Sequence, residues 1–455
     1  MQKTTKLTIK VANIVFMCAI FYFTILDMYA IYKIINTKYL TSGGPESTSH
    51  VLFYYLSFFI TSLFVALFVI GLSKLQEEIK VNLSVMIITI CIVVFTFEVY
   101  LEFHNDLNKI RESRAKKMGI SFDSRSRSEV FGDLINSGIN VYPNIHAREL
   151  TTNKGLLYTL GTISNATTIL GKNEAGFFPI IETDEHGFNN QKGLYEKNKV
   201  NIMLIGDSFA EGCYVQSNET IGAVLCESGY NALSLGMAGN GPFAELASLK
   251  EYAEPLKPRI VLWLYNEADL FDLNRELKSS LLSRYLNEDN FSQNLISRQE
   301  EIDSTLINYS SRMKLKLELI FDNTIIKIIK LSNIRNLLIH TTTDTYKIHI
   351  ENISILKNII QKSKKIVDGW GGKMYFVYLP DHQYKNKDDK FRKYVLRTIT
   401  ELEVPIIDIQ KKVFDRHPEP LSLFPFSVPG HYNADGYRLV TEAIHKRIEA
   451  DEIFP

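Results

Sequence analysis

A serine and a histidine, the residue types that together perform nucleophilic catalysis, stand at the ends of predicted structural elements. The apolar run Ile202–Ile205 ends in Gly206-Asp207-Ser208, and a helical stretch follows it. In a parallel α/β sheet, a residue at this place lies on the carboxyl edge, which is the edge that binds ligands. A serine needs a base before it can attack, and His431, before the last amphipathic helix, is the candidate base. We therefore expect Ser208 and His431 to meet and to perform acyl transfer.

Acyl transfer also needs hydrogen-bond donors aimed at the oxyanion of the tetrahedral intermediate. The backbone N–H of Ser208 lies at the positive end of a helix dipole. Gly239, which follows the second strand, is the candidate for a further N–H donor, because a glycine lets the backbone approach a ligand closely. The side-chain amide of Asn266, after the third strand, is another candidate, and Asn240 is its substitute. Asp207 is expected to bond to the backbone locally.

Each of these residues also has an ordinary structural interpretation. Ser208 is of a type that caps helices, Gly239 fits a simple turn, and His431 fits an exposed loop. The order of the three along the chain, each at the end of a predicted element, favours the catalytic interpretation over three unrelated structural ones.

Strands and helices alternate around these residues, which predicts a parallel sheet in an α/β domain spanning 200–455. The expected strands are Val200–Ile205, Ala232–Met237, Arg259–Tyr265, Met374–Leu379 and Pro405–Ile409. Residues 270–368 are dense in Leu, Ile, Lys and Ser with almost no Gly or Pro, so they predict a helical insertion that caps the fold. The closing helix is expected at Ala434–Ala450.

Residues 105–199 lack a repeating strand–helix pattern and predict a lead-in segment that packs on the catalytic domain. A helix is expected around Ser126–Ser137. The polar stretch Asp184–Asn190 has two interpretations: a tight turn with Gly187 at positive φ, or a loop that borders the active site.

Three apolar stretches in residues 1–104 reach the roughly 20 residues that span a hydrocarbon core: Val11–Tyr32, Val51–Leu72 and Val81–Phe103. The first lacks a small-residue cleavage site, so we interpret it as a retained anchor. Lysines before the first stretch and between the second and third favour a cytoplasmic amino terminus, whereas the basic residues at 109–117 weigh against it. A cytoplasmic amino terminus and three spans would place the rest of the chain outside the cytoplasm.

The chain has 455 residues, and its 51 basic and 51 acidic residues give a formal net charge of zero. A basic surface would be expected of a nucleic-acid-binding protein, so nucleic acid is not an expected partner. Of the four cysteines, Cys213 and Cys226 lie in the soluble part without a metal-ligand spacing, and two free thiols are favoured over a disulfide. We expect no metal and no organic cofactor.

Gly206-Asp207-Ser208, Gly239, Asn266 and His431, each at the end of a suitable element, resemble the four sequence blocks of the SGNH (GDSL) hydrolase superfamily. More closely, the chain resembles bacterial membrane-anchored SGNH proteins over about 120–450. The similar stretches are Phe122–Arg127, Asp184–Asn190, Gly236–Pro242, Leu423–Phe426 and Gly430–Asn433.

This resemblance implies a flavodoxin-like three-layer α/β/α fold and ester chemistry on acylated carbohydrates or lipids. It also implies O-acetyl transfer to an exported polysaccharide, with a membrane O-acyltransferase as a partner that supplies the acyl group. Such proteins work outside the cytoplasm, which favours a multi-pass protein of the cytoplasmic membrane with an extracytoplasmic catalytic domain.

The sequence departs from the family pattern in two places. The acid expected three residues before the histidine is Val428, so a backbone carbonyl or another acid must orient His431, and Asp381, Asp408 and Asp415 are the options nearby. The asparagine at 266 is displaced relative to the following Asp-Leu pair. These departures support a competing hypothesis, a catalytically weak domain that binds glycan or scaffolds a membrane complex. A third hypothesis, a phospholipid or lipoprotein lipase, requires a large apolar cleft in 270–368.

Overall fold

The computed structural model describes residues 6–40, 45–72, 75–104, 107–171, 173–196, 199–319, 328, 331–335, 337, 345–380 and 389–454. Internal contacts divide the chain into two units. One consists of Met1–Asn105 with Asp322–Thr343, and the other of Asp106–Phe321 with Asp344–Pro455.

The first unit contains three long helices, α1 (Lys6–Leu40), α2 (Pro45–Leu72) and α3 (Glu77–His104). Among the described residues, two stretches are long and apolar enough to cross a membrane, Lys6–Tyr29 in α1 and Glu77–Glu102 in α3. The apolar part of α2, Phe59–Gly71, is shorter. Length and composition therefore support two of the three predicted spans.

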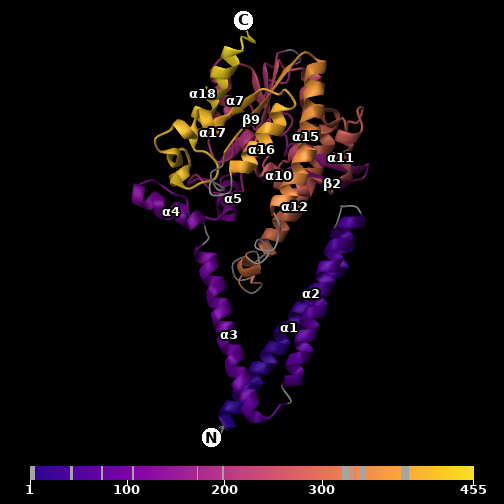
Figure 1. Ribbon diagram of the computed structural model, residues 1–455, viewed down its shortest axis with the longest axis vertical. Helices are drawn as coiled ribbons and strands as arrows, with labels where there is room; N and C mark the ends of the chain where they lie inside the picture. The colour runs from indigo at the N-terminus through magenta and orange to yellow at the C-terminus, as the bar shows by residue number, and fades with distance from the viewer. Residues whose placement is uncertain are drawn as a thin grey trace. The chain divides into compact units, whose positions relative to one another are not determined.

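The second unit, in which Figure 1 labels β9, is built on a sheet of five parallel strands in the order β10-β9-β8-β6-β7. The strands are β6 (Ile202–Ile205), β7 (Ala232–Ser234), β8 (Ile260–Tyr265), β9 (Lys373–Tyr378) and β10 (Ile406–Asp408). All five were predicted, although β7 is shorter than the sequence indicated. Since β6 has β7 on one side and β8 on the other, the chain changes direction at β6, and ligands bind at such switch points.

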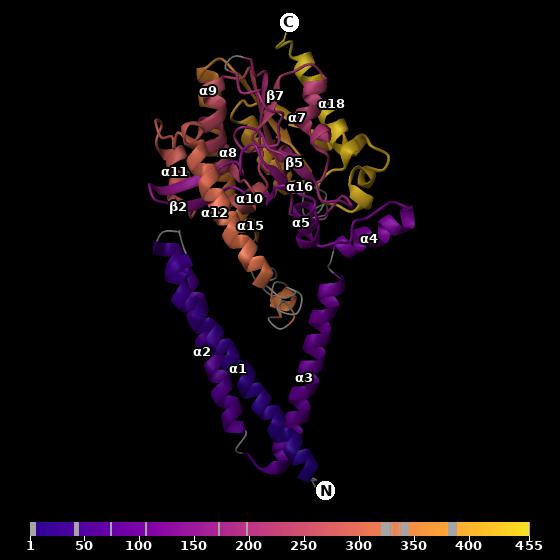
Figure 2. The same ribbon diagram turned by 180° about the vertical axis from the view of Figure 1, so that it is seen from behind.

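Side chains of the strands alternate between two buried clusters, as the period of two in a strand requires. Met203 and Trp263 belong to one cluster, and Leu204 and Leu262 to the other. The first face is covered by α8 (Pro242–Ser248), α11 (Ser280–Asn287), α15 (Thr345–Gly369) and α16 (Asp389–Thr400). The second is covered by α7 (Ile221–Glu227) and α18 (Ala434–Ala450), which lie side by side in Figures 1 and 2. The domain is therefore α/β with helices on both faces of a parallel sheet.

The described part of the chain between β8 and β9 is mainly helical, as its composition predicted. It forms α10 (Asp269–Glu276), α11, the short helix η3 (Leu295–Arg298), α12 (Gln299–Leu319) and α15. Within the first unit, Asn333 donates to the Glu98 carboxylate through its backbone N–H at 2.7 Å and through Nδ2 at 3.0 Å. This part of the insertion therefore packs on α3.

The segment before the sheet forms α4 (Leu107–Met118), α5 (Arg127–Asn136) and two small sheets. One sheet contains β1 (Val141–Pro143), β4 (Thr167–Ile169) and β5 (Ile180–Glu182), and the other is the hairpin of β2 (Arg148–Thr152) and β3 (Gly155–Thr159). Ser126 and Glu129 form a capping box at the start of α5, which confirms the helix predicted there. Leu157 and Phe188 are buried in the same cluster as the central strands, so this segment packs on the sheet domain.

The Asp184–Asn190 stretch is a tight turn, as one of its two interpretations predicted. Gly187 has φ +84°, and the Asp184 carboxylate accepts the backbone N–H groups of His186 at 2.8 Å and Phe188 at 2.9 Å. Asn190 then bonds to both the N–H and the C=O of Ser234 in β7. The side chain of Asn190 thus covers the edge strand of the sheet.

The remaining short elements connect these parts. They are α6 (Ser208–Glu211), η1 (Ser217–Glu219), η2 (Leu249–Ala253), α9 (Glu254–Leu256), α17 (Ile409–Lys412), η4 (Phe414–Arg416), η5 (Pro420–Leu423) and η6 (Pro425–Ser427).

Candidate active site

Ser208 and His431 meet at the carboxyl edge of the sheet. Ser208 begins α6, immediately after β6, and the side chain of Asp207 caps this short helix. His431 lies two residues before Asn433, the N-cap of α18. The Ser208 Oγ is 2.7 Å from the His431 Nε2. Both residues are partly exposed, so the nucleophile and its candidate base are open to a substrate.

Glu174 holds the other side of the imidazole. Its Oε2 lies 3.1 Å from the His431 Nδ1 and also accepts the backbone N–H of His431 at 3.2 Å. Burial raises the pKa of Glu174, but the hydrogen bonds and charge of His431, together with the charge of Arg111, lower it to about 2. An ionised acceptor at Nδ1 requires the proton on Nδ1, which leaves Nε2 free to accept the Ser208 proton.

Among the described residues, the acid that contacts His431 is therefore Glu174, which the sequence analysis did not single out. Asp408 pairs with Arg392 and caps α17, and Asp415 accepts from Gln410, so neither bonds to His431. Asp381 lies outside the described residues. Glu174 follows the turn signal at 171–173, and no local pattern there distinguishes it from an ordinary loop residue.

Asp207 and Asn266 connect the ends of β6 and β8. The Asp207 carboxylate accepts the Phe209 N–H at 2.9 Å, which is the local backbone bond expected of it, and also accepts the Asn266 Nδ2 at 2.7 Å. The Ser208 hydroxyl lies 3.2 Å from the same carboxylate. Burial raises the pKa of Asp207 above its ordinary value, and these hydrogen bonds offset only part of that rise. Asn266 thus supports the turn that carries the nucleophile, and its second Nδ2 hydrogen has no acceptor among the described residues.

Gly239 lies in a turn closed by a 3.0 Å bond from the Asn240 N–H to the Met237 carbonyl. Its φ of +78° is favourable for glycine alone. Arg275 donates to the Gly239 carbonyl, whereas the Gly239 N–H has no acceptor in the described part of the chain. Asn240 is buried, and its Nδ2 lies 3.5 Å from the Gly206 carbonyl at the end of β6. The structure therefore brings both candidate donors to the edge that carries Ser208.

Glu211, which the sequence did not single out, fixes that turn. Its buried carboxylate accepts the Ala238 N–H at 2.7 Å, the Asn144 Nδ2 at 2.7 Å and the Cys213 thiol at 3.3 Å. Burial raises the pKa of both Glu211 and Cys213. Cys213 and Cys226 are free thiols, as the sequence favoured. One carboxylate therefore joins α6, the lead-in segment and the Gly239 turn.

Two aromatic rings pack against the imidazole. The ring centroid of Phe209 lies 4.9 Å from that of His431, and the centroid of Tyr214 lies 4.7 Å away at an angle of 62°. These contacts restrict rotation of the imidazole, so the hydrogen bonds to Ser208 and Glu174 form in a ring that is already positioned.

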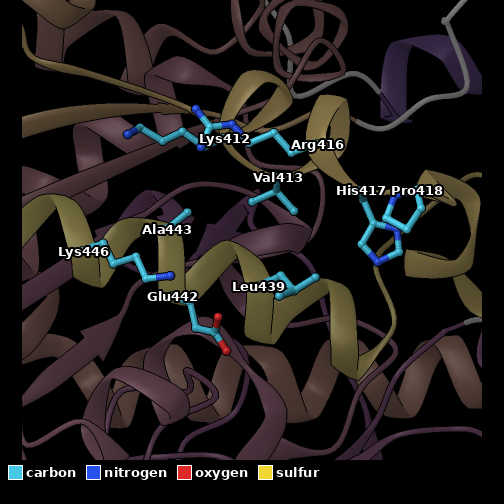
Figure 3. Close-up of a pocket in the computed structure, with 9 residues that line it drawn as sticks. All are labelled: Lys412, Val413, Arg416, His417, Pro418, Leu439, Glu442, Ala443 and Lys446. Carbon is cyan, nitrogen blue, oxygen red and sulfur yellow. The ribbon is translucent and has the colours of Figure 1, made fainter.

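A separate surface hollow of about 310 Å³ lies between the α17–η4 region and α18 (Figure 3). It is lined by Lys412, Val413, Arg416, His417, Pro418, Leu439, Glu442, Ala443 and Lys446. None of the Ser208–His431–Glu174 residues belongs to it, so this basic hollow is distinct from the candidate active site.

No protein-family model matches the sequence, and no curated protein matches it. Among solved structures, the chain is similar to a putative lipolytic protein of the G-D-S-L family from Desulfitobacterium hafniense DCB-2, with 12% identity, a TM-score of 0.32 and coverage of 54% of this chain and 98% of that one. A lipase/acylhydrolase from Enterococcus faecalis matches with 11% identity, a TM-score of 0.31 and coverage of 55% and 96%. An acetyl xylan esterase matches with 10% identity, a TM-score of 0.30 and coverage of 55% and 100%. Similarity at this level does not by itself establish a function.

Proposed function

We propose that this chain is an SGNH-type serine ester hydrolase or O-acyltransferase that acts on acylated cell-surface glycan. The observation that carries the proposal is the continuous chain of contacts from Ser208 through His431 to Glu174. A nucleophile, a base and an ionised orienting group in this order are the requirements for forming an acyl-enzyme, whatever their positions in the sequence.

The reaction follows from this geometry. His431 Nε2 takes the proton of Ser208 Oγ as the oxygen attacks the acyl carbonyl, and Glu174 stabilises the imidazolium that forms. The N–H groups of Ser208 and Gly239, with the amide of Asn266, stabilise the oxyanion. The imidazolium then protonates the departing sugar oxygen. Water or a second sugar hydroxyl attacks the acyl-enzyme, with His431 again as the base, so hydrolase and transferase differ only in the acceptor.

The competing hypothesis of a catalytically weak scaffold rested on the missing acid and the displaced asparagine. Glu174 takes the place of the missing acid, and Asn266 reaches the turn that carries Ser208. The lipase hypothesis required an apolar cleft over the insertion. A hollow of about 680 Å³ there is lined mainly by charged and polar residues, among them Asp289, Lys362 and Asp368, which does not favour a lipid substrate.

Membrane attachment belongs to this proposal. Two apolar helices precede the catalytic domain, and they would anchor it at the outer face of the cytoplasmic membrane. A membrane O-acyltransferase would then supply the acyl group in the transferase form of the reaction. The glycan, the anchor and this partner are inferred from the family resemblance of the sequence together with the site.

The test is hydrolysis of p-nitrophenyl acetate by the full chain in detergent, with Ser208→Ala and His431→Gln beside the wild type. Ser228→Ala and His417→Gln are matched controls, since both residues lie outside the site. Turnover lost in the first pair and kept in the second supports the proposal, whereas wild-type turnover equal to that of Ser208→Ala contradicts it. Release of acetate from acetylated glycan, or its transfer to a second glycan, then separates hydrolase from transferase.

A further inference from the structure

Helix α4 covers the loop that carries His431. The guanidinium of Arg114 donates to the carbonyls of Phe426 at 3.2 Å and Ser427 at 2.8 Å. These two loop residues have φ values of +54° and +57°, a conformation that residues other than glycine adopt only when their surroundings hold them in it. Figure 2 shows α4 beside the yellow segment that leads into α18. Helix α4 therefore stabilises an unfavourable backbone conformation just before the catalytic histidine.

Helix α4 also packs against position 428, where the family pattern would place an acid. Val428, three residues before His431, is 4% exposed and packs in an apolar cluster with Ala115 of α4 and Phe426. An acidic side chain at position 428 would point into this apolar contact and would be destabilised there. At position 428 the loop therefore packs an apolar side chain against α4.

Arg111 of α4 contacts both Glu174 and the loop that carries His431. Its side chain is 2% exposed, and its Nη2 lies 3.4 Å from the Glu174 Oε2 and 3.2 Å from the Pro429 carbonyl. A Cβ on Gly430 would lie 2.7 Å from this Nη2 and 2.8 Å from the Glu174 Oε2. The residue before His431 must therefore lack a side chain for the arginine and the carboxylate to meet.

The charges around His431 show what the arginine does. Within the described part of the chain, Glu174 and Asp207 are the carboxyl groups whose electrostatics include the imidazole of His431. Tyr214 packs on the ring, and burial raises the pKa of its phenol, so that it stays neutral. Arg111 is the cation next to Glu174. It offsets part of the negative charge that Glu174 places next to the imidazole.

We infer that Arg111 is a positioning residue for the Ser208–His431–Glu174 triad and that the buried side of α4 supports the loop that carries His431. This inference rests on the proposed function. Arg111 keeps the Glu174 oxygen shared between itself and the imidazole, and α4 holds the backbone of the histidine loop. Since α3 ends at His104 and α4 begins at Leu107, the helix that positions the triad is the next helix in the sequence after the last apolar one.

The test uses the full chain in detergent, with p-nitrophenyl acetate kinetics and the rate of labelling by a fluorophosphonate measured across pH. The variants are Arg111→Met and Arg111→Lys, and Lys116→Met, at an exposed position on the same helix, is the matched control. We expect Arg111→Met to lower kcat by about 10²-fold, the cost of a misplaced catalytic group, with KM nearly unchanged. The acidic limb of its pH–rate profile should move to higher pH, because the unopposed Glu174 carboxylate favours the imidazolium. Arg111→Lys should keep the limb near its wild-type position, since the charge remains, while kcat falls.

Four other outcomes have distinct meanings. Wild-type kinetics in Arg111→Met would overturn the inference while leaving the proposed function intact. A loss of activity without a shift of the acidic limb, equal in Arg111→Met and Arg111→Lys, would show that the arginine acts only on folding, which also overturns it. If the wild type neither hydrolyses the ester nor reacts with the fluorophosphonate, the proposed function fails and the inference fails with it. If Arg111→Met does not fold, the inference is tested by Arg111→Lys instead, through its kcat and the pH of its acidic limb.

Discussion

Glu174 contacts His431 twice through a single oxygen, because its Oε2 lies 3.1 Å from the ring Nδ1 and 3.2 Å from the backbone N of the same residue. The contact with the ring selects the tautomer with a proton on Nδ1. The contact with the backbone fixes the loop from which the ring projects. A single carboxylate therefore sets both the protonation pattern and the position of the base, although it belongs to a distant part of the chain.

Replacing Glu174 by glutamine should reduce turnover without removing Ser208 or His431. The amide can place its NH₂ group toward Nδ1 and so favour the wrong tautomer, a change that costs about 10⁴-fold in kcat in a serine protease triad. We expect a loss of between about 10² and 10⁴-fold here. The acidic limb of the pH–rate profile should move to lower pH, because a neutral neighbour no longer favours the imidazolium. This shift is opposite to the one expected for Arg111→Met.

Asp415→Asn is the matched control for this substitution. Asp415 was a candidate for the same role, yet it bonds to Gln410 and not to His431. Its amide should leave kcat and the pH–rate profile unchanged. Activity that depends on Asp415 rather than on Glu174 would contradict the assignment of the orienting acid.

Gly430→Ala should disturb the contact between the Glu174 carboxylate and the His431 imidazole. The new Cβ would lie 2.7 Å from the Arg111 Nη2 and 2.8 Å from the Glu174 Oε2, so one of the two side chains must move. A misplacement of this size in a group that orients the base is expected to lower kcat by about 10²-fold, with little change in KM. Gly132→Ala, at a glycine of α5 with open space around it and no positive φ, is the control. Unchanged kinetics in Gly430→Ala would show that the loop adapts freely.

The sequence predicted the parallel sheet well because the central strands β6 and β8 are buried along their whole length and contain only hydrophobic residues. Each strand ends in a polar or glycine-rich segment, so the pattern of residue types alone places the residues at the carboxyl ends on one edge. Ser208, Gly239 and Asn266 were found in this way. The carboxyl end of β7 was predicted at Met237, whereas the strand ends at Ser234. Residues 235–237 are apolar, and the N–H groups of Leu235 and Met237 still bond to the carbonyls of Leu204 and Gly206, so the residue types alone do not mark the end of the strand.

Glu174, Arg111 and Glu211 could not be predicted in the same way. Their roles depend on contacts between segments far apart in the chain, and a charged residue in a loop or on a short helix is ordinarily exposed. Arg111 lies in a run of basic residues after an apolar helix, which fits a membrane-proximal position as well as a buried one. Val428 was the only sign in the sequence, because the absence of an acid at that position required an acid from elsewhere.

Glu211→Gln should disturb the oxyanion side of the site more than the triad. The carboxylate accepts from the Ala238 N–H, the Asn144 amide and the Cys213 thiol, and an amide cannot accept all three. Leaving one buried donor unpaired costs about 1–3 kcal/mol, and the Gly239 turn loses one of its fixed points. We expect a lower melting temperature and a lower kcat, with an unchanged position of the acidic limb. The exposed Glu227→Gln serves as control, and a variant with wild-type kcat would show that Glu211 does not position the turn.

The stability of the protein should depend on pH through Glu174. Its pKa of about 2 in the folded state lies below the ordinary value of 4.5, so the unfolded chain binds a proton more readily than the folded one. The stabilisation is complete above about pH 4.5 and is lost as the pH falls toward 2, and a shift of this size corresponds to about 3 kcal/mol. The melting temperatures of the wild type and of Glu174→Gln should be measured from about pH 7 to pH 2.5. The difference between them should narrow over the acidic part of this range. Asp415→Asn should show no such narrowing relative to the wild type. If the melting temperature of the wild type exceeds that of Glu174→Gln by the same amount down to the acidic end of this range, then His431 and Arg111 do not hold Glu174 ionised.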